Sequence, residues 1–243
     1  MTNFYRLLPN YFTVIAITFL NVSISFSQSE KKGNITTEIT QKKQLGYVLH
    51  LPTIANKKKP LIIFLHGDGE KGTDTEKVKT HGPFKYLKTN TLDAYILAPQ
   101  CPENDLWNTE ILYQLISKIV KENTNIDSSR IYLTGLSSGG WATWNLAFAH
   151  PEMFAALVPI SSFVDLNQMD EACKIKTIPT HIFHGLLDDV VDVSYAISIY
   201  KNLKACNANV ELTIFADAGH DSWSKVYDNK EIYDWMLLQV KKP

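Results

Sequence analysis

The sequence predicts an α/β fold, with a mostly parallel, doubly wound sheet in a single domain. Short strand-like runs alternate with longer helical runs from Gly46 onward, and this alternation is typical of parallel sheets. Several strand-like runs are almost entirely apolar, as expected for strands that are buried on both faces. No internal repeat, low-complexity tract or linker divides the chain, and 243 residues suffice for one sizeable core.

Seven segments have the composition of strands, and four have the periodicity of helices. The expected strands are Gly46–Leu51, Pro60–His66, Ala94–Pro99, Ile131–Gly135, Ala156–Ser161, Thr180–His184 and Val210–Phe215. The expected helices are Asn108–Glu122, Trp141–Phe148, Val193–Leu203 and Lys230–Val240. The first helix has an apolar face that consists of Ile111, Leu112, Leu115, Ile116, Ile119 and Val120.

The N-terminal segment resembles a secretory signal peptide. Arg6 precedes the apolar run Tyr11–Leu20, and small polar residues follow as far as Ser27. The apolar run is shorter than the roughly 20 residues that a membrane-spanning helix needs. We therefore expect a signal peptide over residues 1–27, a poorly ordered lead-in over 28–43 and a folded domain over 44–243. This interpretation predicts a secreted or periplasmic protein without stable membrane anchoring.

Composition and cysteine content exclude several classes of partner and cofactor. Hydrophobic residues make up 45% and charged residues 20%, and the formal net charge is -1. This balance gives no electrostatic reason to expect a nucleic-acid partner. Export would permit a disulfide between Cys173 and Cys206, and the third cysteine, Cys101, leaves an odd count. No cysteine spacing suggests zinc, so we expect neither a metal nor another cofactor.

The segment Gly135-Leu136-Ser137-Ser138-Gly139 lies between an expected strand and an expected helix. This is a G-x-S-x-G motif in strand–turn–helix context, which is typical of a nucleophilic serine. The serine must occupy a sharp turn, and glycines on either side remove Cβ atoms that would clash there. The pattern therefore predicts Ser137 as a nucleophile at the start of a helix.

A second loop follows the expected strand Pro60–His66. It reads His66-Gly67-Asp68-Gly69, and a loop at this place in such a sheet supplies a backbone N–H to an oxyanion hole. We expect the N–H groups of Asp68 and Ser138 to form that hole. The imidazole of His66 is expected to be structural, because lone histidines at strand ends more often stabilise a loop than react.

A nucleophilic serine needs a histidine base and a carboxylate that orients it. Asp188 and Asp189 follow the expected strand Thr180–His184, and His220 follows the last expected strand. Serine, acid and histidine then occur in the chain order of this class of hydrolase. His220 is the only histidine after the acid pair, so it is the candidate base. The residues alone leave Asp188 and Asp189 both open as the acid.

These motifs resemble the α/β-hydrolase superfamily. Within it, the chain resembles secreted carboxylesterases related to feruloyl and acetyl-xylan esterases, dienelactone hydrolases and polyhydroxybutyrate depolymerases. The similarity covers nearly all of residues 44–243. The motifs that carry it are Leu65–Gly72 (L-H-G-x-G-E-R-G), Pro99–Pro102 (P-Q-C-P), Ser129–Gly135 (R-I-Y-L-T-G), His184–Asp188 (H-G-x-x-D) and Gly219–Trp223 (G-H-D-x-W).

The resemblance implies an α/β-hydrolase catalytic domain and selects Asp188 as the acid, because the acid of that group is the D of H-G-x-x-D. The chain departs from the pattern at three positions. Lys71 replaces an arginine, Ser138 a frequent methionine and Asp192 a frequent proline. The first two changes bear on substrate contacts, and the third bears on how firmly the acid loop is held.

The expected function is therefore that of a serine carboxylesterase acting through an acyl-enzyme on Ser137. Its substrate would be a small or polymer-attached ester, possible types being feruloyl, acetyl and polyester. The segment between Ser162 and Ile178 is too short for a large lid, so we expect an open cleft. Trp107, Trp141 and Trp223 are candidates for lining it, and only Trp223 is chosen as a substrate-binding residue.

Two alternatives remain open at this stage. A serine peptidase of the same fold would use the same catalytic groups. A non-catalytic ester- or carbohydrate-binding relative would keep the fold without the reaction. The oligomeric state does not follow from the sequence.

Overall fold

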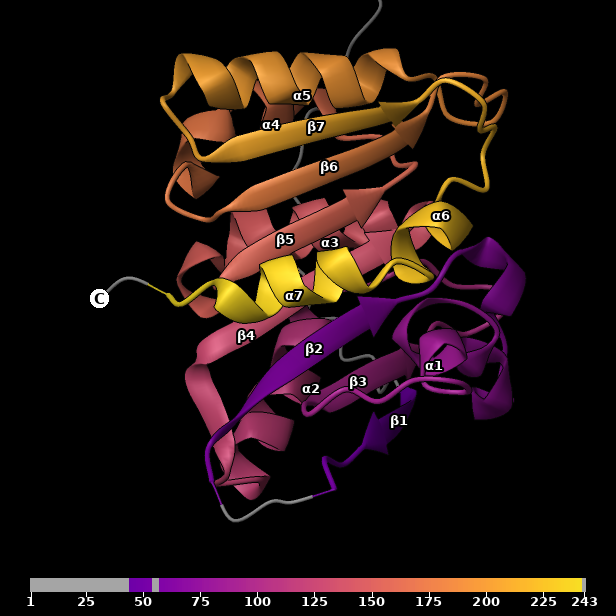
Figure 1. Cartoon of the computed structure of the whole chain (residues 1–243), viewed down its shortest axis with the longest axis vertical. Helices are drawn as coiled ribbons and strands as arrows, with labels where there is room; N and C mark the ends of the chain where they lie inside the picture. The colour runs from indigo at the N-terminus through magenta and orange to yellow at the C-terminus, as the bar shows by residue number, and fades with distance from the viewer. Residues whose placement is uncertain (1–43, 54–56, 242–243) are drawn as a thin grey trace, which may run out of the picture. The chain divides into compact units, whose positions relative to one another are not determined.

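A seven-stranded sheet forms the centre of the computed structural model, which describes residues 44–53 and 57–241 (Figure 1). The strand order is β1-β3-β2-β4-β5-β6-β7. Strand β1 (Gly46–His50) is antiparallel to β3 (Tyr95–Gln100), and every other pairing is parallel. The expected signal peptide and lead-in, residues 1–27 and 28–43, lie outside the described residues.

All seven expected strands are confirmed, with small shifts at their ends. The other five are β2 (Lys59–Leu65), β4 (Ile126–Leu136), β5 (Ala156–Ile160), β6 (Thr180–Gly185) and β7 (Val210–Phe215). Strand β4 starts five residues earlier than expected. The strand residues from Asp127 to Arg130 are polar and partly exposed, so they lack the apolar pattern that marks the rest of the strand.

The four expected helices are present as α2 (Thr109–Glu122), α3 (Ser138–Ala149), α5 (Ser194–Ala205) and α7 (Lys230–Leu238). Asn108 caps α2, because its side chain accepts a hydrogen bond of 3.0 Å from the N–H of Ile111. On the predicted apolar face of α2, the buried residues are Leu112, Leu115, Ile116 and Ile119, and Ile111 and Val120 are half-buried at its margins.

Several short helices were not predicted. They are α1 (Gly82–Tyr86), α4 (Leu166–Asp170), α6 (Trp223–Tyr227) and the 3₁₀ segments η1 (Asp68–Glu70), η2 (Thr75–Lys79), η3 (Pro151–Met153) and η4 (Ala172–Ile175). A segment of about one turn is too short to display helical periodicity, which needs a window of about 11 residues.

Helices cover both faces of the sheet. Figure 1 shows α7 in front of β4 and β5, and α2 and α3 behind the sheet. Two buried clusters match this arrangement, because alternate residues of the central strands belong to different clusters. On β2, Leu61 and Ile63 pack with the helices behind the sheet, whereas Ile62 packs on the side of α7. The doubly wound architecture is thereby confirmed.

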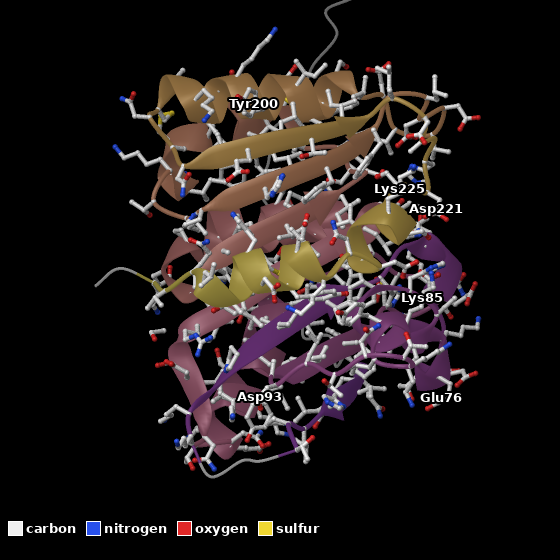
Figure 2. All side chains as sticks on the ribbon, viewed as in Figure 1. Glu76, Lys85, Asp93, Tyr200, Asp221 and Lys225 are labelled. Carbon is white, nitrogen blue, oxygen red and sulfur yellow. A yellow bond between two sulfur atoms is a disulfide. The ribbon has the colours of Figure 1, made fainter. Side chains whose placement is uncertain are left out.

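The parallel strands all end at one edge of the sheet, on the right in Figure 1, and the loops at this edge carry the functional candidates. Figure 2 shows Lys225, on α6, and Asp221, just before α6, at this edge, and Asp93 near the opposite edge. Among the described residues, no helix combines the length and the apolar character needed to cross a lipid bilayer. The same residues contain no His, Cys, Asp and Glu cluster arranged to hold a metal ion.

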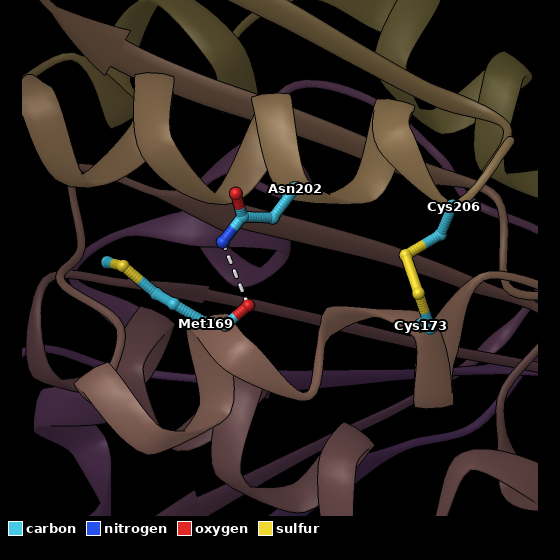
Figure 3. Close-up of a disulfide and its surroundings, with 4 residues drawn as sticks. All are labelled: Met169, Cys173, Asn202 and Cys206. Carbon is cyan, nitrogen blue, oxygen red and sulfur yellow. Dashed lines mark hydrogen bonds between the residues drawn. A yellow bond between two sulfur atoms is a disulfide. The ribbon is translucent and has the colours of Figure 1, made fainter.

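A disulfide connects Cys173, in η4, with Cys206, directly after α5 (Figure 3). The two Cα atoms are 5.3 Å apart, which is within the usual range for a disulfide. A second link runs parallel to it, because the Asn202 side chain donates a 2.9 Å hydrogen bond to the carbonyl of Met169. The pairing that the sequence left possible is therefore confirmed, and it ties α5 to the segment before β6.

Candidate active site

Ser137 occupies the sharp turn between β4 and α3. Its backbone has φ 53° and ψ -120°, which a residue other than glycine adopts only when the surrounding structure enforces it. Two hydrogen bonds hold the turn. The Ser137 N–H donates to the carbonyl of Ile160 at 2.9 Å, and its carbonyl accepts from the N–H of Trp141 at 3.0 Å. The strained turn places the serine at the edge where the parallel strands end.

The glycines of the motif are needed because backbones approach closely there. A Cβ atom on Gly139 would lie 2.0 Å from the carbonyl oxygen of Leu65, and one on Gly135 would lie 2.3 Å from that of Gly139. Both distances are far below van der Waals contact. The pattern G-x-S-x-G therefore reflects the packing of the first turn of α3 against the ends of β2 and β4.

The structure brings the side chains of Ser137, Asp188 and His220 into hydrogen-bond contact. His220 Nε2 lies 3.0 Å from Ser137 Oγ. His220 Nδ1 lies 3.0 Å from Asp188 Oδ1 and 2.9 Å from Oδ2. The carboxylate can only accept, so Nδ1 carries the proton and Nε2 is free to accept the serine hydroxyl proton. This is the geometry of a serine nucleophile with its base and an orienting acid.

The side chain of Asp188 is buried in the turn that follows β6. Its Oδ1 accepts hydrogen bonds from the N–H groups of Val190 at 3.0 Å and Val191 at 2.9 Å. Burial alone would raise the pKa of Asp188, but these bonds and the bond from His220 outweigh it and lower that pKa below its usual value. Asp189 is exposed and does not contact His220. Of the two adjacent acids that the sequence left open, Asp188 is therefore the one that pairs with His220.

The loop that carries His220 is held against the ends of two strands. A Cβ atom on Gly185, the last residue of β6, would lie 2.1 Å from the carbonyl oxygen of Gly219, so the two backbones touch. The hydroxyls of Ser161 and Ser222, both buried, form a 2.7 Å hydrogen bond between the end of β5 and this loop. Sequence reasoning missed this pair, since serine has no pattern that predicts a buried partner.

The expected oxyanion-hole residues lie next to the nucleophile. A Cβ atom on Gly67 would be 3.5 Å from the Cβ of Ser137, so the loop after β2 packs directly against the serine. Ser138 is the first residue of α3 and Asp68 the first of η1, and neither N–H donates a hydrogen bond within the described part of the chain. Helix-start N–H groups are suited to an anion. Their role in an oxyanion hole stays a prediction.

A buried glutamate that sequence reasoning missed supports this loop. Glu70 Oε2 accepts a 3.1 Å hydrogen bond from the N–H of Gly67, and its Oε1 lies 3.4 Å from His81 Nε2. The side-chain amide of Gln100 donates to the Glu70 carbonyl. Burial raises the pKa of Glu70. The available signal was the E of the L-H-G-x-G-E-R-G resemblance, which carries no indication of burial.

Lys71, one of the three departures from the resembled pattern, also acts on this loop. Its ammonium lies 2.8 Å from Asp68 Oδ1. Burial would raise the pKa of Asp68, but the hydrogen bond from Lys71 contributes to lowering it. The side chain of Asp68 is therefore paired with Lys71, whereas its backbone N–H forms no hydrogen bond with the described residues.

His66 behaves as the structural histidine that the sequence predicted. Its Nε2 accepts a 3.0 Å hydrogen bond from the N–H of Cys101, so Nδ1 carries the proton and donates to the Gly67 carbonyl at 2.6 Å. Burial lowers the pKa of His66 to about 4. The ring also packs on Trp107, with centroids 4.8 Å apart.

The three tryptophans have different environments. Trp107, a candidate that was not chosen as a substrate-binding residue, is buried in the core and packs against His66 and α2. Trp141 is half-buried, donates to Asp165 at 3.1 Å and stacks on Phe163. Trp223 is half-buried and meets His220 edge to face, with centroids 5.1 Å apart. It borders the site, and substrate binding by Trp223 stays a prediction.

A comparison with protein-family models matches residues 103–229 to the phospholipase/carboxylesterase family. The matched segment is more than half of the chain, and it contains Ser137, Asp188 and His220.

Curated relatives match parts of the chain. The chain is 29% identical over 100 residues to a putative carboxymethylenebutenolidase of Escherichia coli O157:H7, which is 39% of this chain and 37% of the relative. It is 28% identical over 129 residues to poly(3-hydroxyalkanoate) depolymerase C of Paucimonas lemoignei, 46% of this chain and 30% of the relative. The matches therefore span well under two thirds of these relatives.

Solved structures share the fold. A thermostable esterase superposes with a TM-score of 0.70 at 31% identity, over 81% of this chain and 60% of that one. An acylaminoacyl peptidase of Pyrococcus horikoshii superposes with a TM-score of 0.65, over 83% of this chain and 40% of that one. The identity to the peptidase is 18%, so that likeness concerns the fold alone.

Proposed function

Because the chain belongs to the phospholipase/carboxylesterase family, we propose that it is a serine carboxylesterase with Ser137 as nucleophile. One observation carries the proposal: His220 lies within hydrogen-bond distance of both Ser137 and Asp188. A serine hydroxyl is a weak nucleophile until a base removes its proton, and here the base is in place and is itself oriented.

In the first half of the reaction, Ser137 Oγ attacks the carbonyl carbon of the ester. His220 Nε2 takes the hydroxyl proton, and Asp188 stabilises the imidazolium that forms. The negative charge on the carbonyl oxygen is received by the N–H groups of Asp68 and Ser138, each such donor contributing about 3 kcal/mol to the transition state. His220 then gives its proton to the leaving alcohol, and an acyl-enzyme on Ser137 remains.

In the second half, water takes the place of the alcohol. His220 removes a proton from the water as it attacks the acyl carbon, and returns that proton to Ser137 Oγ when the carboxylic acid leaves. The same oxyanion donors serve both halves. No group other than those of the protein and water is needed to balance these steps.

The substrate that we propose is a small or polymer-attached carboxylic ester. The names of the curated relatives support this range, since one is a polyester depolymerase and another a bifunctional acetylxylan esterase/xylanase of Neocallimastix patriciarum. The short segment between β5 and β6, which holds only α4 and η4, supports a cleft without a large lid. Half-buried Trp223 would form part of its wall.

We also propose that residues 1–27 direct export and that the mature chain works outside the cytoplasm. The signal-like pattern of these residues supports the proposal. The Cys173–Cys206 disulfide is consistent with it, because such bridges persist in oxidising compartments.

The test is hydrolysis by the purified protein of nitrophenyl acetate and butyrate, with aminoacyl nitroanilides measured in parallel. The proposal predicts ester hydrolysis that Ser137→Ala abolishes and little release from the anilides. Faster cleavage of the anilides would indicate a peptidase, and no cleavage of either would indicate a binding protein. Ester hydrolysis that persists in Ser137→Ala would overturn the assignment of the nucleophile.

A further inference from the structure

A second histidine contacts the acid of the candidate site. His184 lies on β6, and its side chain is fully buried. Its Nε2 lies 2.9 Å from the carbonyl oxygen of Val191 and 3.1 Å from Asp188 Oδ2. The mechanism proposed above uses only His220, so this second imidazole has no role in it.

The protonation of His184 follows from its neighbours. Both atoms near Nε2, the Val191 carbonyl oxygen and Asp188 Oδ2, can only accept a hydrogen bond. Nε2 therefore carries a hydrogen, which it donates to the Val191 carbonyl, and Asp188 Oδ2 lies beside this N–H as a polar contact of 3.1 Å. The Nδ1 of this ring is buried and forms no hydrogen bond with the described residues, so it offers no competing arrangement.

The carboxylate of Asp188 is consequently held from three sides. Oδ1 accepts hydrogen bonds from the N–H groups of Val190 and Val191. Oδ2 pairs with Nδ1 of His220 at 2.9 Å and has Nε2 of His184 beside it at 3.1 Å. The imidazoles of His220 and His184 therefore both contact Asp188 Oδ2. A rotation of the carboxylate away from His220 would also move Oδ2 away from the His184 N–H.

Resting on the esterase function proposed above, we propose that His184 is a positioning residue for Asp188. Its Nε2–H fixes the carboxylate in the orientation that faces His220 and takes up part of the negative charge on Oδ2. His184 would thereby act on the base through the acid, without touching the substrate.

Removing this donor has a predictable electrostatic direction. A carboxylate with one donor fewer presents more negative charge to His220, and that charge favours the imidazolium. The acidic limb of the pH–rate profile should therefore move to higher pH, while the rate at the plateau falls because Asp188 is less well oriented. A purely structural role for His184 would lower the amount of folded enzyme without moving the limb.

Other charged groups near these residues stay unchanged in such a test. Asp192, on the loop after Asp188, is exposed and lies within electrostatic range of His184. On the far side of His220, the Trp223 ring lies between the rings of His220 and His81, and His81 is paired with Glu70.

Two exposed acids lie on the loop that carries His220. Asp217 is paired with Lys225 of α6 at 2.8 Å. Exposed Asp221 follows His220 directly and accepts a 3.1 Å hydrogen bond from the N–H of Ser224.

The experiment compares His184→Phe, His184→Asn and His184→Gln with the unmodified enzyme. The glutamine amide nitrogen reaches about as far as imidazole Nε2 and can donate to Asp188, whereas the asparagine amide is too short. His181→Asn is the matched control, because His181 lies on the same strand but on its opposite face, where it pairs with Thr213 at 2.9 Å. A fluorophosphonate titration of Ser137 gives the concentration of active enzyme for every variant.

We expect kcat per active site to fall roughly tenfold to a hundredfold in His184→Phe and His184→Asn, the size of a hydrogen bond to a charged group. The acidic limb of kcat/KM should move to higher pH in both. His184→Gln should restore most of kcat and the original limb, and His181→Asn should change neither. If His184→Phe does not fold, the comparison of asparagine with glutamine still decides.

The inference is overturned if the asparagine and glutamine variants share one profile, or if the asparagine variant matches the unmodified enzyme in kcat per active site and in the position of its acidic limb. These outcomes are separate from a failure of the proposed function. In that case the unmodified enzyme itself would hydrolyse no ester, or Ser137→Ala would stay active.

Discussion

The hydroxyls of Ser161 and Ser222 meet at 2.7 Å and connect the end of β5 to the loop that carries His220. Both side chains are buried, and Ser161 has a positive φ of 46° that turns it toward the loop. The position of the base therefore depends on a contact between the end of β5 and the His220 loop as well as on Asp188.

Ser222→Ala removes this contact and leaves the Ser161 hydroxyl buried without its partner. We expect the free energy of unfolding to fall by about 1–3 kcal/mol, the cost of an unsatisfied buried polar group. Urea unfolding measures it. The double variant Ser161→Ala/Ser222→Ala should be more stable than the sum of the single variants indicates, because no orphan hydroxyl remains. Simple additivity would contradict this account of the pair.

Gly139→Ala should prevent folding or cost more than about 4 kcal/mol, because its Cβ would lie 2.0 Å from the Leu65 carbonyl oxygen. Gly69→Ala is the matched control on the neighbouring loop. Nothing lies within 4 Å of a Cβ at Gly69, so that variant should fold normally. Circular dichroism and soluble yield distinguish them, and equal behaviour of the two variants would refute the packing argument.

His66 should make stability depend on pH. The unfolded chain binds a proton on this histidine near pH 6.5, whereas burial lowers the pKa in the folded protein to about 4. The unfolded state thus gains protons first, so stability is intact above pH 6.5 and is lost as the pH falls toward 4. Between pH 7.5 and 5 this histidine should account for about 2 kcal/mol of lost stability.

The measurement is the free energy of unfolding at both pH values for the unmodified protein and for His66→Gln. Glutamine does not titrate and can still accept from the N–H of Cys101. Between pH 7.5 and 5, the His66→Gln variant should lose about 2 kcal/mol less of its free energy of unfolding than the unmodified protein loses. Parallel pH dependence in the two proteins would exclude His66 as the cause.

Asp188→Asn and Asp189→Asn should separate the two adjacent acids. An amide at position 188 cannot stabilise the imidazolium or fix its tautomer, and kcat should drop by about 10⁴-fold. Asp189 is exposed and has no contact with His220, so its variant should keep nearly full kcat on nitrophenyl butyrate. A large loss in Asp189→Asn with full activity in Asp188→Asn would reverse the assignment.

Reduction of the Cys173–Cys206 disulfide should lower stability without changing the reaction. The bridge joins residues separated by 33 positions, and closing a loop of that length contributes about 3–4 kcal/mol in the chain-entropy description. Guanidinium unfolding with and without reductant should differ by that amount, while kcat on nitrophenyl butyrate stays constant. Cys173→Ser/Cys206→Ser serves as the control, because added reductant should leave its unfolding curve unchanged.

The strands and the three main site residues could be predicted because each has a local signal. Apolar runs mark the buried strands, and Ser137 and His220 follow strand ends in motifs with few competitors. Asp188 could be separated from Asp189 only by resemblance, because adjacent acids in a turn have the same local pattern. The structure separates them through the N–H groups of Val190 and Val191, which bind one of the two carboxylates.

What could not be predicted depends on contacts between distant segments. The burial of Trp107 follows from its packing on His66, 41 positions earlier in the chain. The contact of His184 with Asp188 could not be predicted either, because the H-G-x-x-D resemblance places the histidine four residues before the acid without showing that the two side chains meet. Glu70 gave no sign of burial, since charged residues after a strand usually face solvent.

The disulfide lies at the edge of the sheet opposite Ser137, because Cys173 precedes β6 and Cys206 precedes β7. The covalent cross-link and the candidate catalytic residues thus lie at opposite ends of the strands. Substitutions near the bridge are therefore expected to change the free energy of unfolding while the distances among Ser137, His220 and Asp188 stay the same.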